Sequence, residues 1–140
     1  MKKFFTVACI LFSVSSSLAQ SADEAAVRKV LSNQEAAWNL GNIHDFMKSY
    51  WADDSLVFVG KTVTYGWQPT LENYKKRYPD TAAMGKLSFK LLECKPLSTG
   101  YYFVVGGWHL QRTVGDVGGY FTLLFKKIKG QWVIIADHSS

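Results

Sequence analysis

The sequence predicts an α+β domain, in which helices from the first half pack on one face of an antiparallel sheet formed by the second half. The chain has 140 residues, of which 48% are hydrophobic and 15% aromatic, and this composition suits one compact core. Apolar residues recur mostly at helical spacing up to about residue 78, whereas residues 86–138 form long β-rich runs. Helices followed by a meander of strands are typical of the α+β class.

The N-terminal segment is expected to lie outside this domain. A basic start is followed by an almost wholly apolar run at residues 4–14 and by small side chains up to Ala19. This is the layout of a secretory signal peptide, so we expect residues 1–19 to be removed and residues 20–140 to form the domain. The apolar run is short for a membrane span, although an uncleaved N-terminal anchor is the alternative. We therefore expect an exported protein, periplasmic or secreted, with no membrane attachment after cleavage.

Three helices are predicted in the first half of the domain. The first has a capping box beginning at Ser21 and a helix-stopping glycine at Gly41. Asn42 is placed to cap a second, short helix. The third helix is expected over residues 67–78, with a proline near its first position. The adjacent acidic residues Asp53-Asp54 are expected to form a turn after the second helix.

Six strands are predicted to complete the domain. Two short strands, at residues 56–59 and 62–65, precede the third helix. The four long runs cover residues 86–94, 100–112, 119–128 and 131–138. Gly106-Gly107 lies inside the second long run and predicts a bulge or a sharp bend, as a curved sheet requires.

The turn of the last hairpin predicts which residues of its two strands lie opposite each other. If Lys129-Gly130 is a two-residue turn, Ile128 lies opposite Gln131 and an uninterrupted ladder places Phe121 opposite His138. The more apolar face of this hairpin, expected to meet the helices, then carries Phe121, Leu123, Phe125, Trp132, Ile134 and His138. Asp137 is expected on the opposite face. That second face is still too apolar for free solvent, which predicts a homodimer through the sheet.

Several short motifs in this order resemble one family. Trp38-Asn39-Leu40-Gly41-Asn42 is similar to the end of its first helix, and Trp51-Ala52-Asp53-Asp54-Ser55 to the lead into its first strand. Tyr65-Gly66-Trp67 is similar to the turn into its third helix, and residues 119–140 are similar to its last hairpin. Together they resemble the nuclear transport factor 2-like superfamily, and specifically its uncharacterised SnoaL-like branch, many of whose members are exported bacterial proteins.

The resemblance covers about residues 25–140 and implies a cone-shaped, cystatin-like fold with an apolar cavity between the helices and the curved sheet. The first hypothesis is therefore a module that binds a small hydrophobic or aromatic molecule. The candidate ligand-binding residues are Trp38, Tyr50, Tyr74, Tyr78, Phe103, Trp108, His109, Phe121 and Trp132. For each aromatic residue the alternative is plain core packing, and the sequence leaves open which face His109 occupies.

The second hypothesis is an isomerase, cyclase or dehydratase. Steroid isomerases of the superfamily carry an aspartate base at the position that falls here at about Val59, and valine accepts no proton. His138 is then the best candidate for the catalytic acid or base, because an imidazole near a cavity mouth titrates near neutral pH. This predicts that His138→Gln removes turnover. The alternative is that His138 and Ser139 bond backbone groups and hold the C-terminus in place.

Other function classes have weaker support. The net charge is +5, but the basic residues are dispersed apart from residues 75–77 and 126–127, so no nucleic-acid partner is expected. No histidine pair has ligand spacing and Cys94 is isolated, so neither a metal nor another cofactor is expected. A third hypothesis, a homo-oligomerising interaction domain, follows from a resemblance to the association domain of calmodulin-dependent kinases.

Overall fold

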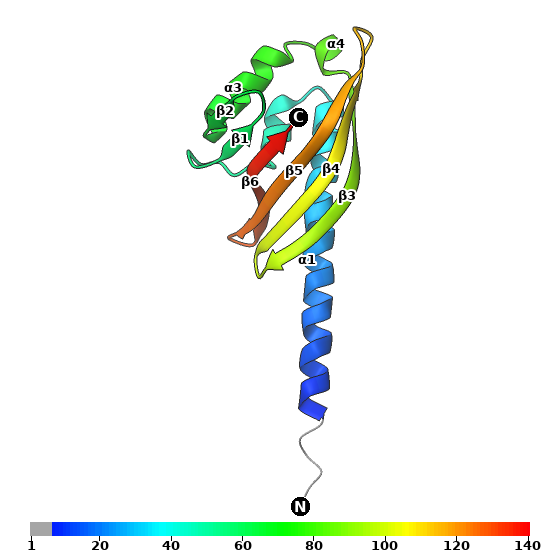
Figure 1. Ribbon diagram of the computed structural model, residues 1–140, viewed down its shortest axis with the longest axis vertical. Helices are drawn as coiled ribbons and strands as arrows, with labels where there is room; N and C mark the ends of the chain where they lie inside the picture. Colours follow the sequence, from blue (N-terminus) through cyan, green and yellow to red (C-terminus); the bar gives the residue numbers. More distant parts are fainter. Residues whose placement is uncertain (1–6) are drawn as a thin grey trace, which may run out of the picture.

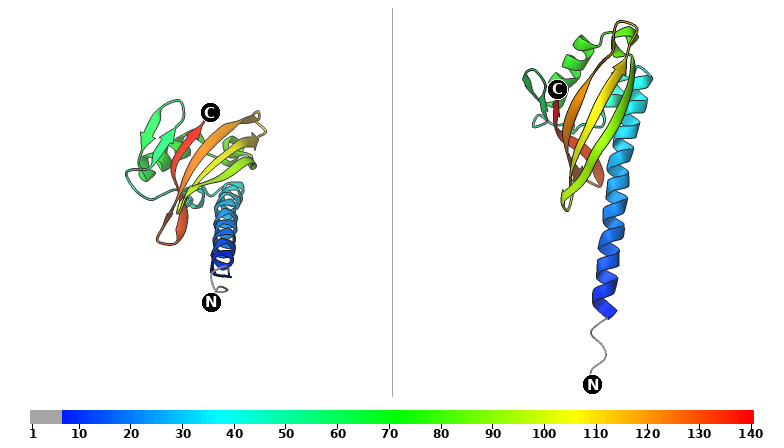
Figure 2. Two further views of the ribbon diagram at one scale, coloured as in Figure 1. Left: turned by 60° about the horizontal axis from the view of Figure 1, so that its bottom comes forward. Right: turned by 45° about the vertical axis from the view of Figure 1, so that its right-hand side comes forward.

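The helices lie on one face of a bent six-stranded sheet in the computed structural model (Figures 1 and 2), which describes the backbone of residues 7–140 and side chains from residue 18 onward. The helices are α1 (Val7–Asn39), α2 (Ile43–Met47), α3 (Trp67–Arg77) and α4 (Thr81–Met84). The strands are β1 (Val57–Val59), β2 (Val63–Tyr65), β3 (Lys86–Ser98), β4 (Tyr101–Gln111), β5 (Val117–Ile128) and β6 (Gln131–Ser139). The α+β prediction is confirmed.

The first helix differs from the prediction at its N-terminal end. The capping box at Ser21 does not begin a helix, because α1 runs without a break from Val7 to Asn39. The sequence contains no glycine or proline before Gly41 that would interrupt it. The prediction of a signal peptide falls largely on residues 1–17, whose side chains lie outside the described residues. Within the described part of the chain, no helix combines the length and apolarity needed to cross a membrane.

Local signals fix the other helix boundaries. Gly41 has φ +76°, a left-handed conformation that ends α1 as predicted. The side chain of Asn42 accepts a hydrogen bond from the backbone N–H of Asp45 at 2.9 Å and so caps α2. Asp53 accepts the N–H of Ser55 at 2.8 Å, which confirms the predicted turn. Helix α4 was not predicted; its cap is Asp80, which accepts the N–H of Ala83.

The sheet has the strand order β2-β1-β6-β5-β4-β3. Every neighbouring pair is antiparallel except β1 and β6, which are parallel, so the prediction of a wholly antiparallel sheet is wrong at this one pair. The pairing joins strands that are far apart in sequence, which short-range hairpin signals do not report. Strand β3 lies at the edge of the sheet and extends through Pro96, next to an irregularity in its ladder.

The predicted register of the last hairpin holds only near its turn. Ile128 pairs with Gln131 and Phe125 with Ile134 as predicted, but Leu124 then pairs with Ala136, which leaves Ile135 as the extra residue of a β-bulge. A one-residue shift exchanges the two faces of a strand. Beyond the bulge, therefore, Asp137 is buried on the helix-facing side and His138 is exposed.

Contacts on the other edge of β6 explain the bulge. The backbone N–H of Ile134 donates to the carbonyl of Ser49, and the N–H of Trp51 donates to the carbonyl of Ile134, each at 2.9 Å. A few residues later β6 pairs with β1, with Val57 opposite Ala136. The bulge thus lies where β6 passes from one neighbouring segment to the next.

Candidate functional site

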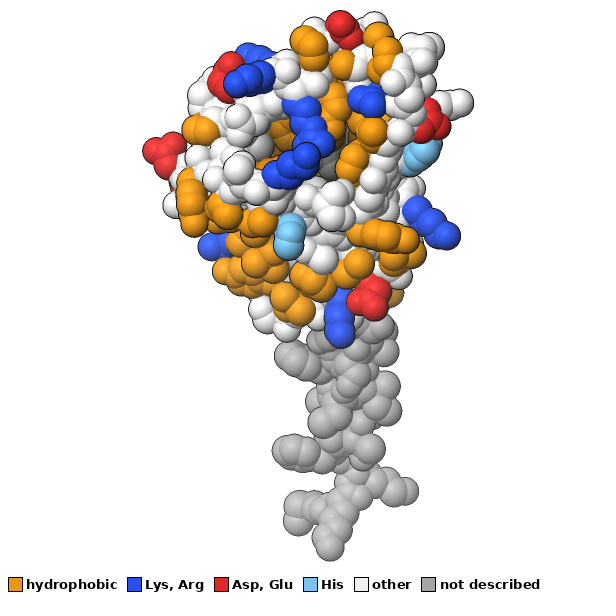
Figure 3. Space-filling model, turned by 45° about the horizontal axis from the view of Figure 1, so that its top comes forward, with side chains coloured by type: hydrophobic (Ala, Val, Ile, Leu, Met, Phe, Trp, Pro, Cys, Tyr) orange, Lys and Arg blue, Asp and Glu red, His pale blue; other side chains and the backbone are white. Residues whose placement is uncertain are grey.

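A cavity of about 650 Å³ opens between the helices and the sheet. Figure 3 looks into it and shows hydrophobic side chains inside the hollow. The lining comes from α1, α2, α3, the β1–β2 hairpin and strands β3 to β6. Its buried members are Gln34, Trp38, Phe46, Tyr50, Thr70, Tyr78, Leu87, Leu110, Phe121, Leu123 and Asp137.

One wall of the cavity is a cluster of aromatic rings held by Trp38. The ring of Trp38 meets Phe46 at 5.0 Å and Tyr78 at 4.9 Å between centroids, both edge to face. Its indole N–H donates to the carbonyl of Met84 at 3.1 Å, which satisfies the only polar atom of the side chain. Tyr74 packs on Phe46 at 5.1 Å and completes this wall. Interlocked rings of this kind give the cavity a fixed apolar surface.

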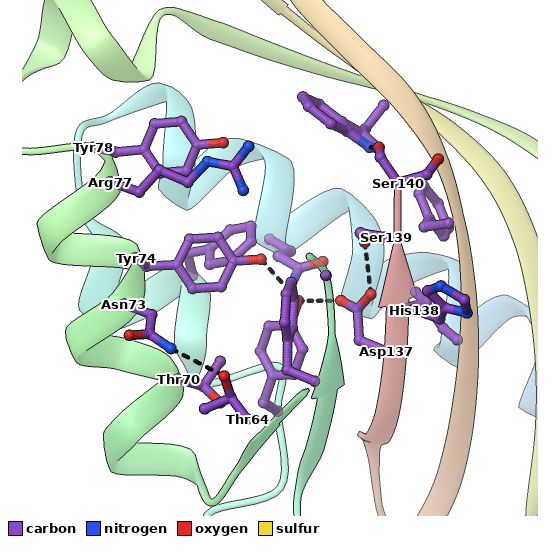
Figure 4. Close-up of a pocket in the computed structure, with 18 of the residues that line it drawn as sticks. Thr64, Thr70, Asn73, Tyr74, Arg77, Tyr78, Asp137, His138, Ser139 and Ser140 are labelled. Carbon is purple, nitrogen blue, oxygen red and sulfur yellow. Dashed lines mark hydrogen bonds between the residues drawn. The ribbon is translucent and has the colours of Figure 1, made fainter. Parts of the chain in front are cut away.

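A buried carboxylate faces the cavity from β6. The hydroxyl of Tyr50 donates to Oδ2 of Asp137 at 2.7 Å, and the hydroxyl of Ser139 donates to Oδ1 at 2.6 Å. The hydroxyl of Tyr74 lies 3.4 Å from that of Tyr50. In Figure 4, two dashed lines, which mark the contacts made by the hydroxyl of Tyr50, connect the hydroxyl of Tyr74 on α3 to Asp137. A proton or a hydrogen-bonding group in the cavity therefore has a connected path to the carboxylate.

Burial sets the acid–base character of this network. Desolvation raises the pKa of Asp137 from 3.8 to about 6, although the hydrogen bonds from Ser139 and Tyr50 act in the opposite direction. Burial, together with the nearby charge of Asp137, raises the pKa of Tyr50 and that of Tyr74 well above the usual value for tyrosine. Both tyrosines therefore remain hydrogen-bond donors at neutral pH, whereas Asp137 changes its charge near neutrality and is able to accept or release a proton there.

Six of the predicted ligand-binding residues line the cavity: Trp38, Tyr50, Tyr74, Tyr78, Trp108 and Phe121. Phe103 does not, because it alternates along β4 with the buried residues Tyr102 and Val104 and so faces the other side of the sheet. Trp132 is buried outside the cavity, where it packs on Tyr102 at 5.3 Å. His109 is exposed, and its imidazole lies 3.2 Å from the carboxylate of Asp116.

His138 reaches the cavity rim, but Figure 4 shows its imidazole on the side of β6 away from Asp137. The expectation that it shares the cavity face is wrong, because the bulge at Ile135 exchanges the two faces of β6. The same bulge brings in Asp137, which the uninterrupted ladder had placed on the far side. Among the described residues, no three His, Cys, Asp or Glu side chains gather as a metal-ion site would require.

Gln34 also lines the cavity, although it was not among the candidate site residues predicted from the sequence. Its side chain is only 2% exposed, and its amide Nε2 has no hydrogen-bond partner among the residues that the structure describes. A buried donor left unpaired destabilises the folded state by about 1–3 kcal/mol. Gln34 follows the helical spacing of the apolar residues on α1, but that spacing does not indicate whether a buried amide has an acceptor.

We expect Gln34→Met to increase the free energy of unfolding by about 1 kcal/mol, because methionine fills a similar volume without an unpaired donor. Urea denaturation followed by tryptophan fluorescence measures the change. Asn33→Met, on the exposed side of the same helix, is the control and should change stability by less than about 0.5 kcal/mol. Equal stability of the Gln34→Met variant and the parent chain would mean that the amide has an acceptor in solution.

Comparison with known proteins relates the whole fold to solved structures. An NTF-2-like protein of unknown function from Shewanella oneidensis superposes with a TM-score of 0.80 at 40% sequence identity, and the match covers 86% of this chain and 98% of that one. No family model and no curated protein matches the chain. The identity over nearly the full length of the Shewanella protein is high enough to establish kinship.

More distant structures share the fold. A domain of unknown function with a cystatin-like fold from Nostoc punctiforme has a TM-score of 0.70 at 14% identity, over 85% of this chain and 76% of that one. A ketosteroid isomerase-like protein from Erwinia carotovora has a TM-score of 0.64 at 17% identity, over 83% of this chain and 93% of that one. At these identities the likeness is one of architecture alone.

Proposed function

Because the chain belongs to the nuclear transport factor 2-like superfamily, we propose that its cavity binds a small hydrophobic or aromatic molecule. The observation that carries the proposal is a cavity of about 650 Å³ with aromatic walls and a single buried carboxylate. Pockets of about 300–1,000 Å³ with apolar walls and a few convergent polar groups are typical of small-molecule sites. The cross-packed rings around Trp38 support a preformed site, which lowers the cost of ordering on binding.

Thermal unfolding in the presence of ligand classes tests this proposal. Steroids, terpenoids and polyketide fragments are added to the purified protein, and hits are confirmed by native mass spectrometry. We expect one class to raise the melting temperature and to bind one molecule per chain, since a ligand at about 100 times its Kd stabilises the folded state by about 2.7 kcal/mol. The absence of both a thermal shift and a bound mass for every class would contradict the proposal.

A second candidate function is proton transfer to or from the bound molecule, as in an isomerase, a cyclase or a dehydratase. The observation that favours it is the position of Asp137, a carboxyl group of pKa about 6 in the cavity wall, with Tyr50 bonded to it. Strand β1 contributes Phe58 to the cavity and no titratable side chain, so the acid–base role falls on Asp137 rather than on a residue near Val59.

The two candidate acid–base residues differ in their expected effects on turnover. With a substrate from the active ligand class, Asp137→Asn should abolish the reaction, because the amide neither accepts nor releases a proton near neutral pH. His138→Gln should leave the rate within about twofold, because its imidazole lies on the other side of β6. Unchanged turnover in the Asp137→Asn variant would exclude this mechanism.

We also propose that the protein is exported and that two copies of it form a homodimer. The side of the sheet away from the helices carries half-buried apolar residues, among them Phe103, Val105, Leu124 and Ile135, which a second copy would cover. We expect the protein expressed with its N-terminus in a bacterial host to lose residues 1–19 and to have the mass of a dimer in solution. Intact mass spectrometry shows whether residues 1–19 have been removed, and light scattering measures the mass of the protein in solution. An unprocessed chain would contradict export, a monomer at micromolar concentration would contradict the dimer, and a larger defined oligomer would favour an interaction domain.

A further inference from the structure

The rim of the cavity carries positive charge. The exposed residues that line it are Lys61, Thr62, Asn73, Arg77, His138 and Ser140. Arg77 is the last residue of α3, and Lys61 lies in the turn between β1 and β2. The lining contains one acidic side chain, Asp137, and that residue is buried in the interior. The mouth is thus cationic, and the interior is mainly aromatic and aliphatic, with Asp137 and the neutral amide of Gln34 among its few buried polar groups. Figure 3 shows basic side chains at the mouth and hydrophobic ones inside the hollow.

Neither rim cation is neutralised within the protein. In the part of the chain that the structure describes, Arg77 and Lys61 form no salt bridge and no side-chain hydrogen bond. Four basic residues elsewhere do have acidic partners: Arg28 with Glu24, Lys48 with Asp45, Lys75 with Glu72 and Lys127 with Asp23. The two cations at the mouth therefore remain available to an anionic group from outside.

Arg77 is already held in a position to bind such a group. Its guanidinium carbon lies 5.6 Å from the centre of the Tyr78 ring, over the ring face. Tyr78 is buried in the cavity wall, and Figure 4 shows the guanidinium extending from α3 over the cavity, beside the ring of Tyr74. This cation–π contact uses none of the N–H donors of the guanidinium, so they stay free for a bidentate contact with a carboxylate.

The buried part of the wall around Asp137 is unsuited to an anionic group of the ligand. Both oxygens of Asp137 are already bonded, to the hydroxyls of Tyr50 and Ser139, and the charge that Asp137 carries at neutral pH would repel a ligand acid group. An acid group on the ligand is therefore favoured at the rim, and the apolar remainder is favoured inside, where the aromatic side chains lie.

We infer that the ligand is an amphipathic organic acid, whose apolar body fills the aromatic interior and whose carboxylate pairs with Arg77 at the mouth, with Lys61 adding a second positive charge. This inference rests on the proposed ligand-binding function and narrows it to one chemical class. Polar contacts at the mouth would also fix the direction in which the molecule enters, with its uncharged end first.

Matched pairs of probes test the inference. The probes are dodecanoate with dodecanamide, and para-biphenylcarboxylate with para-biphenylcarboxamide, because each pair differs in charge at nearly constant shape. Titration calorimetry on the full protein should give at least about tenfold tighter binding of the acids at low salt, a preference that decreases as salt is raised. Arg77→Gln should remove most of this preference. Lys76→Gln is the control, since it removes the same charge from an exposed position of α3 that does not line the cavity.

The outcomes separate this inference from the function on which it rests. Acids that bind more tightly than amides only while Arg77 is present would support it. Equal or tighter binding of the amides, or an acid preference that survives Arg77→Gln, would overturn it and leave the cavity as a binding site for neutral molecules. If no probe binds and the broader thermal screen also fails, the inference and the proposed function fail together.

Discussion

At pH 7 we expect the Asp137→Asn variant to be more stable than the parent chain by up to about 3 kcal/mol. The pKa of Asp137 is raised from 3.8 to about 6 by burial, and each pKa unit corresponds to about 1.4 kcal/mol. An amide has nearly the same shape and no charge to desolvate. Its oxygen still accepts the hydrogen bond from Tyr50, and the hydroxyl of Ser139 is able to turn and accept from the amide nitrogen.

The extra stability of the Asp137→Asn variant over the parent chain should increase as the pH rises. Because the folded chain holds the Asp137 proton more tightly than the unfolded chain does, the carboxyl group contributes stability fully below pH about 4 and loses it as the pH rises through about 6. The difference between variant and parent should therefore be small near pH 4 and largest above about pH 6. Urea denaturation across this range, by fluorescence and circular dichroism, measures it.

Asp54→Asn provides the matched control for this experiment. It makes the same chemical change at an exposed position, and Asp54 lies outside the cavity. We expect its stability relative to the parent to change little over the same pH range. A difference for Asp137→Asn that is constant with pH, or a variant less stable than the parent at pH 7, would show that the carboxylate is well solvated or that its charge stabilises the fold. In either case its role as a titrating group in the cavity would be lost.

Local sequence signals were sufficient for most of the secondary structure. The stripe of apolar residues on α1, the glycine that ends it and the turn at Asp53 each depend on atoms a few residues apart, and each prediction is confirmed. The sequence predicted a bulge or bend at Gly106-Gly107, and the recorded irregularity lies on the partner strand instead. The ladder of β3 against β4 is irregular directly opposite, between Leu91 and Glu93.

The candidate acid–base residue could not be predicted from the same signals. Which of Asp137 and His138 faces the cavity depends on the bulge at Ile135, and that bulge depends on backbone contacts to residues 49–51. These segments are more than eighty positions apart in the chain. The role of Arg77 was hidden for a different reason. In the sequence it completes a basic cluster suited to a helix C-terminus, and only the packing of α3 places it over the cavity.

The Gly106→Ala variant should lose ligand affinity by at least about tenfold and stability by about 1–3 kcal/mol. A methyl group at Gly106 would overlap Cζ of Phe121 and lie 2.9 Å from its Cε2, with the carbonyl oxygen of Lys90 at 3.0 Å on its other side. The backbone leaves no room, so the ring of Phe121 must move. That ring already packs on Phe89 at 5.4 Å and lines the cavity, so the open direction is into the space that the ligand needs.

Gly107→Ala separates this effect from the general cost of replacing glycine in a strand. Gly107 is the next residue of β4 and faces the other side of the sheet, where a methyl group would meet its nearest atom, the carbonyl oxygen of Gly119, at an ordinary 3.5 Å. We expect this control to bind ligand like the parent chain. Calorimetry with the tightest-binding probe, together with urea denaturation, measures both quantities. If Gly106→Ala bound as tightly as Gly107→Ala, the ring of Phe121 could not border the occupied space, and the ligand would have to lie elsewhere than between α3 and the floor formed by β4 and β5.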